Sequence, residues 1–183
     1  MKKIILIIDL IFIVNTGIFS QENNKGLFNL FSGPSIQQNA VSIDFGTLIW
    51  DLSSGGFGIG ASYERSIHKM FSVMGHISYS NHDWNYLAFE FHGRWYPFGT
   101  SLGKLFAMVN FGYGVFWDNS SNEKWAVHTL KISPKTGWKL LFRNGIFFEP
   151  IIGYGFPFVL NENKGELNIA SSLGIGLNIG WAF

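Results

Sequence analysis

One set of side chains in the sequence has the composition of a hydrolytic site: a histidine, a serine and a glutamate. His76 and Ser78 are two residues apart, so they lie on the same face of an extended strand. If the chain turns back near residues 81–85, Glu90 lies opposite His76. A serine beside a histidine that is oriented by a carboxylate is an arrangement used in nucleophilic catalysis. These residues are therefore the candidates for an enzymatic site.

A second set consists of charged side chains that share one face of the expected strands, opposite a face of large apolar residues. If the apolar face meets lipid, the charges must point inward, because a charge facing lipid near the midplane costs about 2–4 kcal/mol. In a narrow lumen they must also pair, since an isolated buried charge is costly. We therefore expect a structural network of ion pairs; the alternative is a selectivity filter for a solute. Its members are Asp44, Glu64, Glu90, Arg94, Lys131, Lys135, Lys139 and Glu149.

One ion pair of this network depends on the length of a turn. A two-residue turn, Asn144–Gly145, would place Lys139 opposite Pro150. A three-residue loop, Arg143–Gly145, with its glycine in the left-handed conformation, places Lys139 opposite Glu149. Because both charges must point inward, we expect the second register.

The strands that must position these side chains are best defined at the carboxyl end. Residues 174–183 read GIGLNIGWAF, with large apolar side chains at every second position and glycine, asparagine or alanine between them. A period of two is that of a strand. A wholly apolar face opposite a face of small or polar side chains is what a strand needs when lipid lies outside and a narrow lumen lies inside. This end resembles the assembly signal of bacterial outer-membrane β-barrels, whose residues here would be Leu177, Ile179, Trp181 and Phe183.

The same alternation recurs in seven earlier segments, which are separated by turn-rich connections. Pro134, inside one of them, is expected at a bulge. Eight strands are the smallest number that closes a membrane barrel of this kind. The expected fold class is therefore all-β, an eight-stranded antiparallel transmembrane β-barrel over residues 39–183. The earlier strands are expected at 40–52, 57–65, 71–80, 85–96, 104–117, 125–142 and 146–159.

An even number of strands places both ends of the barrel on one side, the periplasmic side for this class of protein. The loops near Ser53, Asn81, Asn119 and Asn163 would then face outside. They could hold a host or small-molecule ligand, whose identity stays unknown. Inside the barrel, Phe106, Met108, Phe116 and Phe147 are expected to occlude the lumen together with the charges.

The residues before the barrel have the pattern of an export signal. Lys2 and Lys3 precede an apolar run over residues 4–14, and small or polar residues follow. This predicts a secretory signal peptide over residues 1–20, cleaved after Ser20; the alternative is an uncleaved anchor. Residues 21–38 are expected to form a polar amino-terminal tail.

Composition excludes several classes of function. The chain has no cysteine, which excludes a disulfide framework and thiolate metal sites. A formal net charge of +1 gives no basic surface for nucleic acid. No phosphate-binding loop or metal-ligand motif is present, so we expect no cofactor and no metal.

Three stretches carry a family resemblance that covers residues 40–183: ASYERSIHKMFSV, GRWYPFG and the terminal IGWAF. With them the chain resembles the small eight-stranded outer-membrane barrels of the OmpX and OmpW type, and uncharacterised barrels of spirochaetes and related bacteria. The resemblance implies an outer-membrane location, with outer-membrane lipid and the barrel assembly machinery as partners. It implies no particular chemistry.

The His76, Ser78 and Glu90 set also resembles the His-x-Ser plus Glu arrangement of the outer-membrane lipid A deacylase barrels. That resemblance implies Ser78 as nucleophile, His76 as base and Glu90 as its orienter. In that family the site faces lipid, whereas strand parity here turns the three side chains inward. We therefore expect a polar contact in the lumen, no catalytic residue, and a non-enzymatic protein with a structural, adhesive or small-solute passage role. The rival interpretations are a lipid A deacylase-type enzyme and a soluble lipocalin-like lipid carrier, which would turn its apolar face inward.

Overall fold

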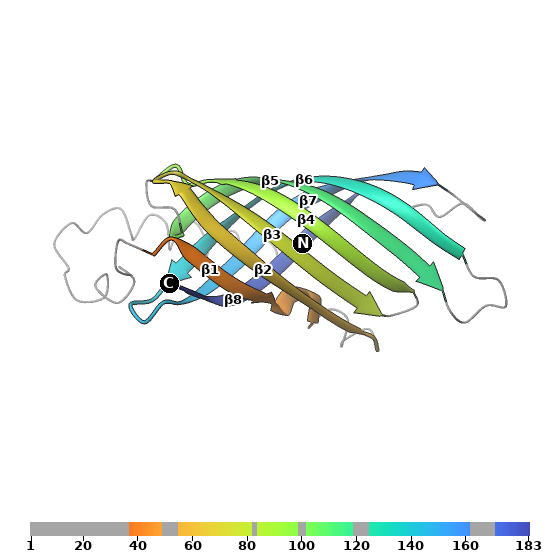
Figure 1. Ribbon diagram of the computed structural model, residues 1–183, viewed down its shortest axis with the longest axis horizontal. Coiled ribbons are helices and arrows are strands. Elements are labelled where there is room, and N and C mark those ends of the chain that lie inside the picture. The colour runs from red at the N-terminus through yellow and green to blue at the C-terminus, as the bar shows by residue number, and fades with distance from the viewer. Residues whose placement is uncertain (1–36, 49–54, 82–83, 99–101, 119–124, 162–170) are drawn as a thin grey trace, which may run out of the picture.

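The computed structural model describes residues 37–48, 55–81, 84–98, 102–118, 125–161 and 171–183. Within them the chain forms eight antiparallel strands that close into a barrel, each pairing with its sequence neighbours and β1 also with β8 (Figure 1). The expected all-β fold, an eight-stranded antiparallel barrel, is confirmed, while the expected signal peptide and most of the polar tail lie outside the described residues. The strands are β1 (Asn39–Asp44), β2 (Phe57–His68), β3 (Phe71–Asn81), β4 (Asn85–Trp95), β5 (Lys104–Asp118), β6 (Trp125–Leu141), β7 (Ile146–Asn161) and β8 (Ser172–Ala182).

Large apolar side chains cover the outside of the barrel, and smaller or polar ones point inward. In β4, for example, Phe89 and Phe91 are exposed, while Glu90 and His92, which alternate with them, are buried. This is the parity that the period of two predicts. Every strand contributes exposed apolar residues to the outer surface, among them Val41, Ile59, Ile77, Phe89, Phe111, Ile132, Ile152 and Trp181.

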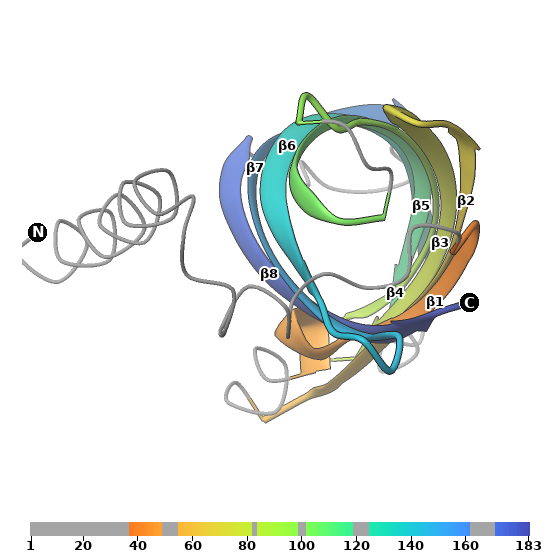
Figure 2. The same ribbon diagram turned by 90° about the vertical axis from the view of Figure 1, so that its left-hand side faces the viewer.

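The described chain enters and leaves the barrel at the same end. The backbone N–H groups of Gln38 and Asn39 donate to the Phe183 carbonyl at 3.2 and 3.0 Å, and the Phe183 N–H donates to the Asn39 carbonyl at 2.8 Å. We call this the terminal end; it also carries the β2–β3, β4–β5 and β6–β7 connections (Figures 1 and 2). The opposite end, the loop end, carries the other connections.

Removing Phe183 should lower the amount of barrel in the outer membrane more than it impairs folding in detergent. The residue directly follows β8, with an exposed ring 5.6 Å from the ring of Trp181, and its backbone hydrogen bonds join the end of β8 to β1. Levels in the outer-membrane fraction would be compared for the native chain, the truncated chain and Phe183→Tyr, which keeps a terminal aromatic ring. Equal levels of the native and truncated chains would contradict the prediction.

The first strand is shorter than predicted, because β1 ends at Asp44 and residues 45–48 form a helical turn. The Asp44 carboxylate accepts hydrogen bonds from the Thr47 N–H at 3.0 Å and from its hydroxyl at 2.6 Å. An aspartate that binds free N–H groups in this way caps the start of a helix. The turn packs on β8, since a Cβ at Gly46 would lie 2.8 Å from the Leu177 nitrogen. The last part of the predicted strand lies outside the described residues.

The register of β6 and β7 is the one predicted from charge. Leu140 pairs with Phe148, which places Lys139 opposite Glu149. The Gly145 N–H donates to the Phe142 carbonyl at 3.0 Å, and Gly145 has a φ of 87°, so the loop has three residues with glycine in the left-handed region.

The prediction of a bulge at Pro134 is wrong. The register shift between β6 and β7 falls between His128 and Thr129, and Pro134 pairs in regular register with Val109 of β5. Proline lacks only its N–H, so the strand loses one hydrogen bond there without slipping. The remaining strands begin and end within about three residues of expectation. Among the described residues, no helix is long and apolar enough to cross a membrane.

Candidate functional site

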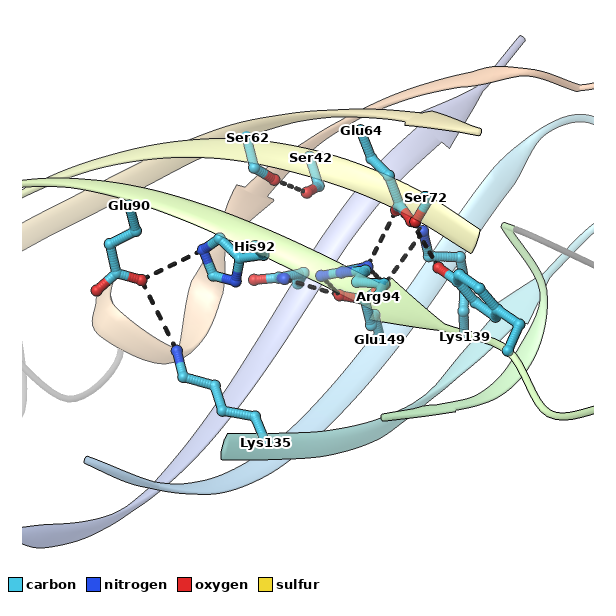
Figure 3. A network of polar contacts seen from close by, with 12 residues as sticks. Ser42, Ser62, Glu64, Ser72, Glu90, His92, Arg94, Lys135, Lys139 and Glu149 are labelled. Carbon is cyan, nitrogen blue, oxygen red and sulfur yellow. Dashed lines mark hydrogen bonds and ion pairs between the residues drawn. The ribbon is translucent and has the colours of Figure 1, made fainter. Parts of the chain in front are cut away.

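Four charged side chains meet in the lumen in the terminal half of the barrel and form what we call the terminal cluster (Figure 3). Arg94 donates to the two carboxylate oxygens of Glu149 at 2.9 and 2.8 Å, and to Glu64 at 3.0 Å. Lys139 contacts Glu64 and lies 3.2 Å from Glu149. All four are buried. Two cations and two anions thus neutralise each other where unpaired charges would be costly.

Three uncharged side chains add hydrogen bonds to the two carboxylates of this cluster. The Tyr96 hydroxyl donates to Glu64 at 2.6 Å, and the Ser72 hydroxyl donates to the same carboxylate. The Asn178 amide donates to Glu149 at 3.0 Å. The sequence analysis assigned no role to Ser72, Tyr96 or Asn178. All three occupy inward-facing positions close to charged residues, and this pattern could have predicted the hydrogen bonds.

Aromatic rings pack against the cations of the terminal cluster. The Arg94 guanidinium lies 4.6 Å from the centre of the Phe106 ring, and the Lys139 amine lies 4.5 Å from the centre of the Phe147 ring. Such contacts stabilise a cation that has left water. Phe147 continues the packing toward the terminal end in a buried cluster with Ala40, Leu102 and Ala182.

The occluding residues expected from the sequence divide between two levels of the barrel. Phe106 and Met108 pack together with Tyr96 beside the terminal cluster, and all are buried. Phe116 lies nearer the loop end, where its ring stacks on Tyr86 at 4.2 Å. Together with the terminal cluster, the packed aromatic and aliphatic side chains close the terminal half of the lumen.

Nearer the loop end, a second group of charges surrounds Glu90; we call it the Glu90 cluster. The amines of Lys131 and Lys135 lie 2.5 and 3.8 Å from its carboxylate, and the His92 Nε2 lies 3.3 Å from it. The Asn110 amide also donates to Glu90. The lysine side chains are 29% and 24% exposed, so solvent from the loop end reaches this level of the lumen.

Asp44 was expected in the same network but makes its hydrogen bonds locally. Both carboxylate oxygens are used by Thr47 in the helical turn described above. The expected network therefore forms as two clusters, with Asp44 serving as a helix cap in the wall of the barrel.

The candidate catalytic residues lie in the register predicted for them. His76 pairs with Glu90 and Ser78 with Ala88, so the three candidate side chains share the inward face. The Glu90 carboxylate, however, is held by the lysines, His92 and Asn110. In the described part of the chain, no hydrogen bond joins Ser78 to His76; the His76 ring instead lies 6.0 Å from the His92 ring, edge to face.

These positions define the chemistry that the lumen can support. A carboxylate that is paired with two lysines is not oriented toward His76 as a third catalytic group would be. Among the described residues, no group of three histidine, aspartate or glutamate side chains could hold a metal ion. The charges are arranged to neutralise one another and to fill the lumen.

Comparisons with known proteins bear on the fold. No family model matches the chain, and no curated protein matches it. Among solved structures, the N-terminal β-barrel domain of Pseudomonas aeruginosa OprF is similar, with a TM-score of 0.54 and 15% sequence identity. The match covers 81% of this chain and 100% of that domain. At this identity the likeness concerns the fold alone, which is a small eight-stranded β-barrel of the outer-membrane type.

Proposed function

We propose that this chain is a non-enzymatic outer-membrane protein, a barrel of the OmpX or OmpW type with a structural or adhesive role and a closed lumen. It is exported through a cleaved signal peptide, inserted with the help of the barrel assembly machinery, and surrounded by outer-membrane lipid. The observation that carries the proposal is the combination of an apolar outer surface on every strand with a lumen whose charges pair internally.

The outer surface supports a membrane location over a soluble carrier. A soluble lipid carrier needs an apolar interior for its ligand and a polar exterior for water. Here Phe89, Phe91 and Phe111 are exposed outside, whereas Glu64, Arg94 and Lys139 are buried inside. An apolar surface of this extent is unusual on a soluble monomer and is what lipid requires.

The closed terminal half supports a structural or adhesive role over solute passage. The terminal cluster and the rings of Phe106 and Phe147 fill the lumen there. The connections at the loop end are then the parts available to contact molecules outside the cell. Most of them lie outside the described residues, including those near Ser53, Asn119 and Asn163, so the ligand of an adhesive role stays open.

The lipid A deacylase-type alternative is less favoured because of the contacts of Glu90. Its carboxylate is shared by Lys131 and Lys135, and Ser78 faces the lumen, away from lipid substrates. A lipid hydrolysis assay on purified, folded protein, with Ser78→Ala as control, tests this directly. Hydrolysis that is lost in Ser78→Ala would overturn the non-enzymatic proposal.

Tryptophan fluorescence should report the membrane location. Trp95 and Trp181 are 46% and 54% exposed on the outside, and Trp117 and Trp138 share the outward parity of their strands. Because indole favours the membrane interface, lipids brominated on their acyl chains should quench the native barrel in vesicles. A water-soluble quencher should quench it much less. Heat-dependent migration on a gel would confirm that the barrel is folded, and a folded barrel without quenching by brominated lipid would contradict the proposal.

A further inference from the structure

A groove of about 430 Å³ lies on the outside of the barrel at the β6–β7 turn. This turn projects at the terminal end, close to the carboxyl terminus of the chain (Figures 1 and 2). The groove is lined by Phe142, Arg143, Asn144, Ile146 and Phe148. It is separate from the lumen and from both charged clusters.

Three of the five residues that line the groove are apolar, and this apolar side continues the outer surface of the barrel. The rings of Phe142 and Phe148 meet edge to face, with centres 5.8 Å apart. Ile146 and Phe148 are exposed on the outward face of β7. A hydrocarbon chain lying along the barrel could therefore enter the groove on its apolar side, against Ile146 and the two rings.

The turn beside the groove is held in place by hydrogen bonds. The Asn144 side-chain oxygen accepts from the Ile146 N–H at 3.1 Å. The Asn144 carbonyl accepts from the indole N–H of Trp181 at 2.9 Å. A Cβ at Gly145 would collide with the Trp181 ring, so the close approach of turn and indole requires glycine. The groove is thus preformed and lies beside a tryptophan, the residue that favours the membrane interface.

A cation stands at the rim of this apolar groove. Arg143 is exposed. In the described part of the chain, its guanidinium makes no ion pair or hydrogen bond, in contrast to Arg94 in the lumen. A guanidinium presents a planar set of donors that matches two oxygens of a phosphate. Charge and shape together therefore fit a ligand with a phosphate head and a hydrocarbon tail.

We propose that this groove binds a phospholipid of the membrane leaflet at the terminal end, with the phosphate on Arg143 and an acyl chain packed along the rings of Phe142 and Phe148. The inference rests on the proposed membrane location, because only there do the β6–β7 turn and Trp181 meet lipid headgroups. It adds a defined lipid site, distinct from the general contact of the barrel with lipid.

Lipid binding would be measured by native mass spectrometry on the folded, full-length chain released from detergent in the presence of phosphatidylglycerol. Arg143→Gln should bind about tenfold more weakly, the loss expected when one charge-assisted pair is removed, and Arg143→Lys should retain an intermediate affinity. Arg65→Gln is the matched control, because Arg65 is an exposed cation on the outward face of β2 and does not line the groove. A diacylglycerol with the same acyl chains should bind the native chain as weakly as phosphatidylglycerol binds Arg143→Gln, and inorganic phosphate should not displace the phospholipid.

Several results would overturn the inference. One is equal binding of phosphatidylglycerol and diacylglycerol by the native chain. Another is an equal loss in Arg143→Gln and Arg65→Gln, and a third is an Arg143-dependent dimer in place of a lipid adduct. Heat-dependent migration establishes that each variant is folded. If the native chain fails to enter vesicles, the proposed function fails as well; if it enters vesicles and Arg143→Gln binds lipid normally, only the lipid site fails.

Discussion

Replacing Arg94 with methionine should lower the free energy of unfolding of the barrel by about 3–5 kcal/mol, the usual cost of removing one partner from a buried ion pair. Arg94 donates to Glu64 and to both carboxylate oxygens of Glu149. Without it, Lys139 alone must neutralise two buried carboxylates. The change would be measured by urea titration of the folded form, which migrates differently from the unfolded form on an unheated gel.

A second substitution separates lost charge balance from lost packing. Arg94→Met together with Glu149→Gln removes one cation and one anion and leaves the Lys139–Glu64 pair in place. This double variant should recover most of the stability lost in Arg94→Met, because a neutralised interior no longer contains an unpaired charge. If the two substitutions destabilise additively, the terminal cluster is not the coupled unit described here.

The full-length barrel should show no stable large conductance in a planar bilayer, whereas Phe106→Ala combined with Phe147→Ala should produce discrete openings. The Phe106 ring packs against Arg94 and the Phe147 ring against Lys139. Removing both rings leaves space beside these charged groups that water can enter. Phe89→Ala combined with Phe111→Ala is the matched control, since it removes the same number of rings from the outer surface. Large stable openings of the native chain, or openings in the control variant alone, would contradict the assignment of a closed lumen.

The strands and their inward faces were predictable because the barrel imposes one simple rule on the sequence. An apolar outer surface and a narrow lumen require large apolar residues to alternate with small or polar ones, and a period of two is visible in a single sequence. The pairing of Lys139 with Glu149 followed from the same rule, since only one loop length keeps both charges on the inward face. Alternation along the sequence therefore determines the register of two strands where charged residues identify their inward faces.

Other features depend on contacts that alternation does not encode. Val41 and Ile43 alternate with polar residues as a long first strand would, yet Asp44 binds Thr47 and ends β1 there. Arg94 on β4 forms an ion pair with Glu149 on β7, which lies across the lumen and is not a neighbouring strand. Leu102, with a φ of 77°, lies in the β4–β5 connection and still fills the terminal end of the lumen. Each of these depends on three-dimensional proximity between distant parts of the chain.

The early end of β1 also affects which strand pair forms late in folding and separates first in local unfolding. The strand pairing of β1 with β8 runs from Ala40 to Asp44, opposite Ala182 to Asn178, and the bonds to Phe183 extend it by one residue, whereas β2 and β3 pair along nearly their whole length. This joint also connects the two ends of the barrel sequence, so it closes the longest loop of chain, and it does so with five residue pairs, as few as the β1–β2 joint has. Local opening should begin where the pairing is short. The β1–β8 joint should therefore be the last part of the barrel to form, and its amide hydrogens should be among the first to exchange with solvent.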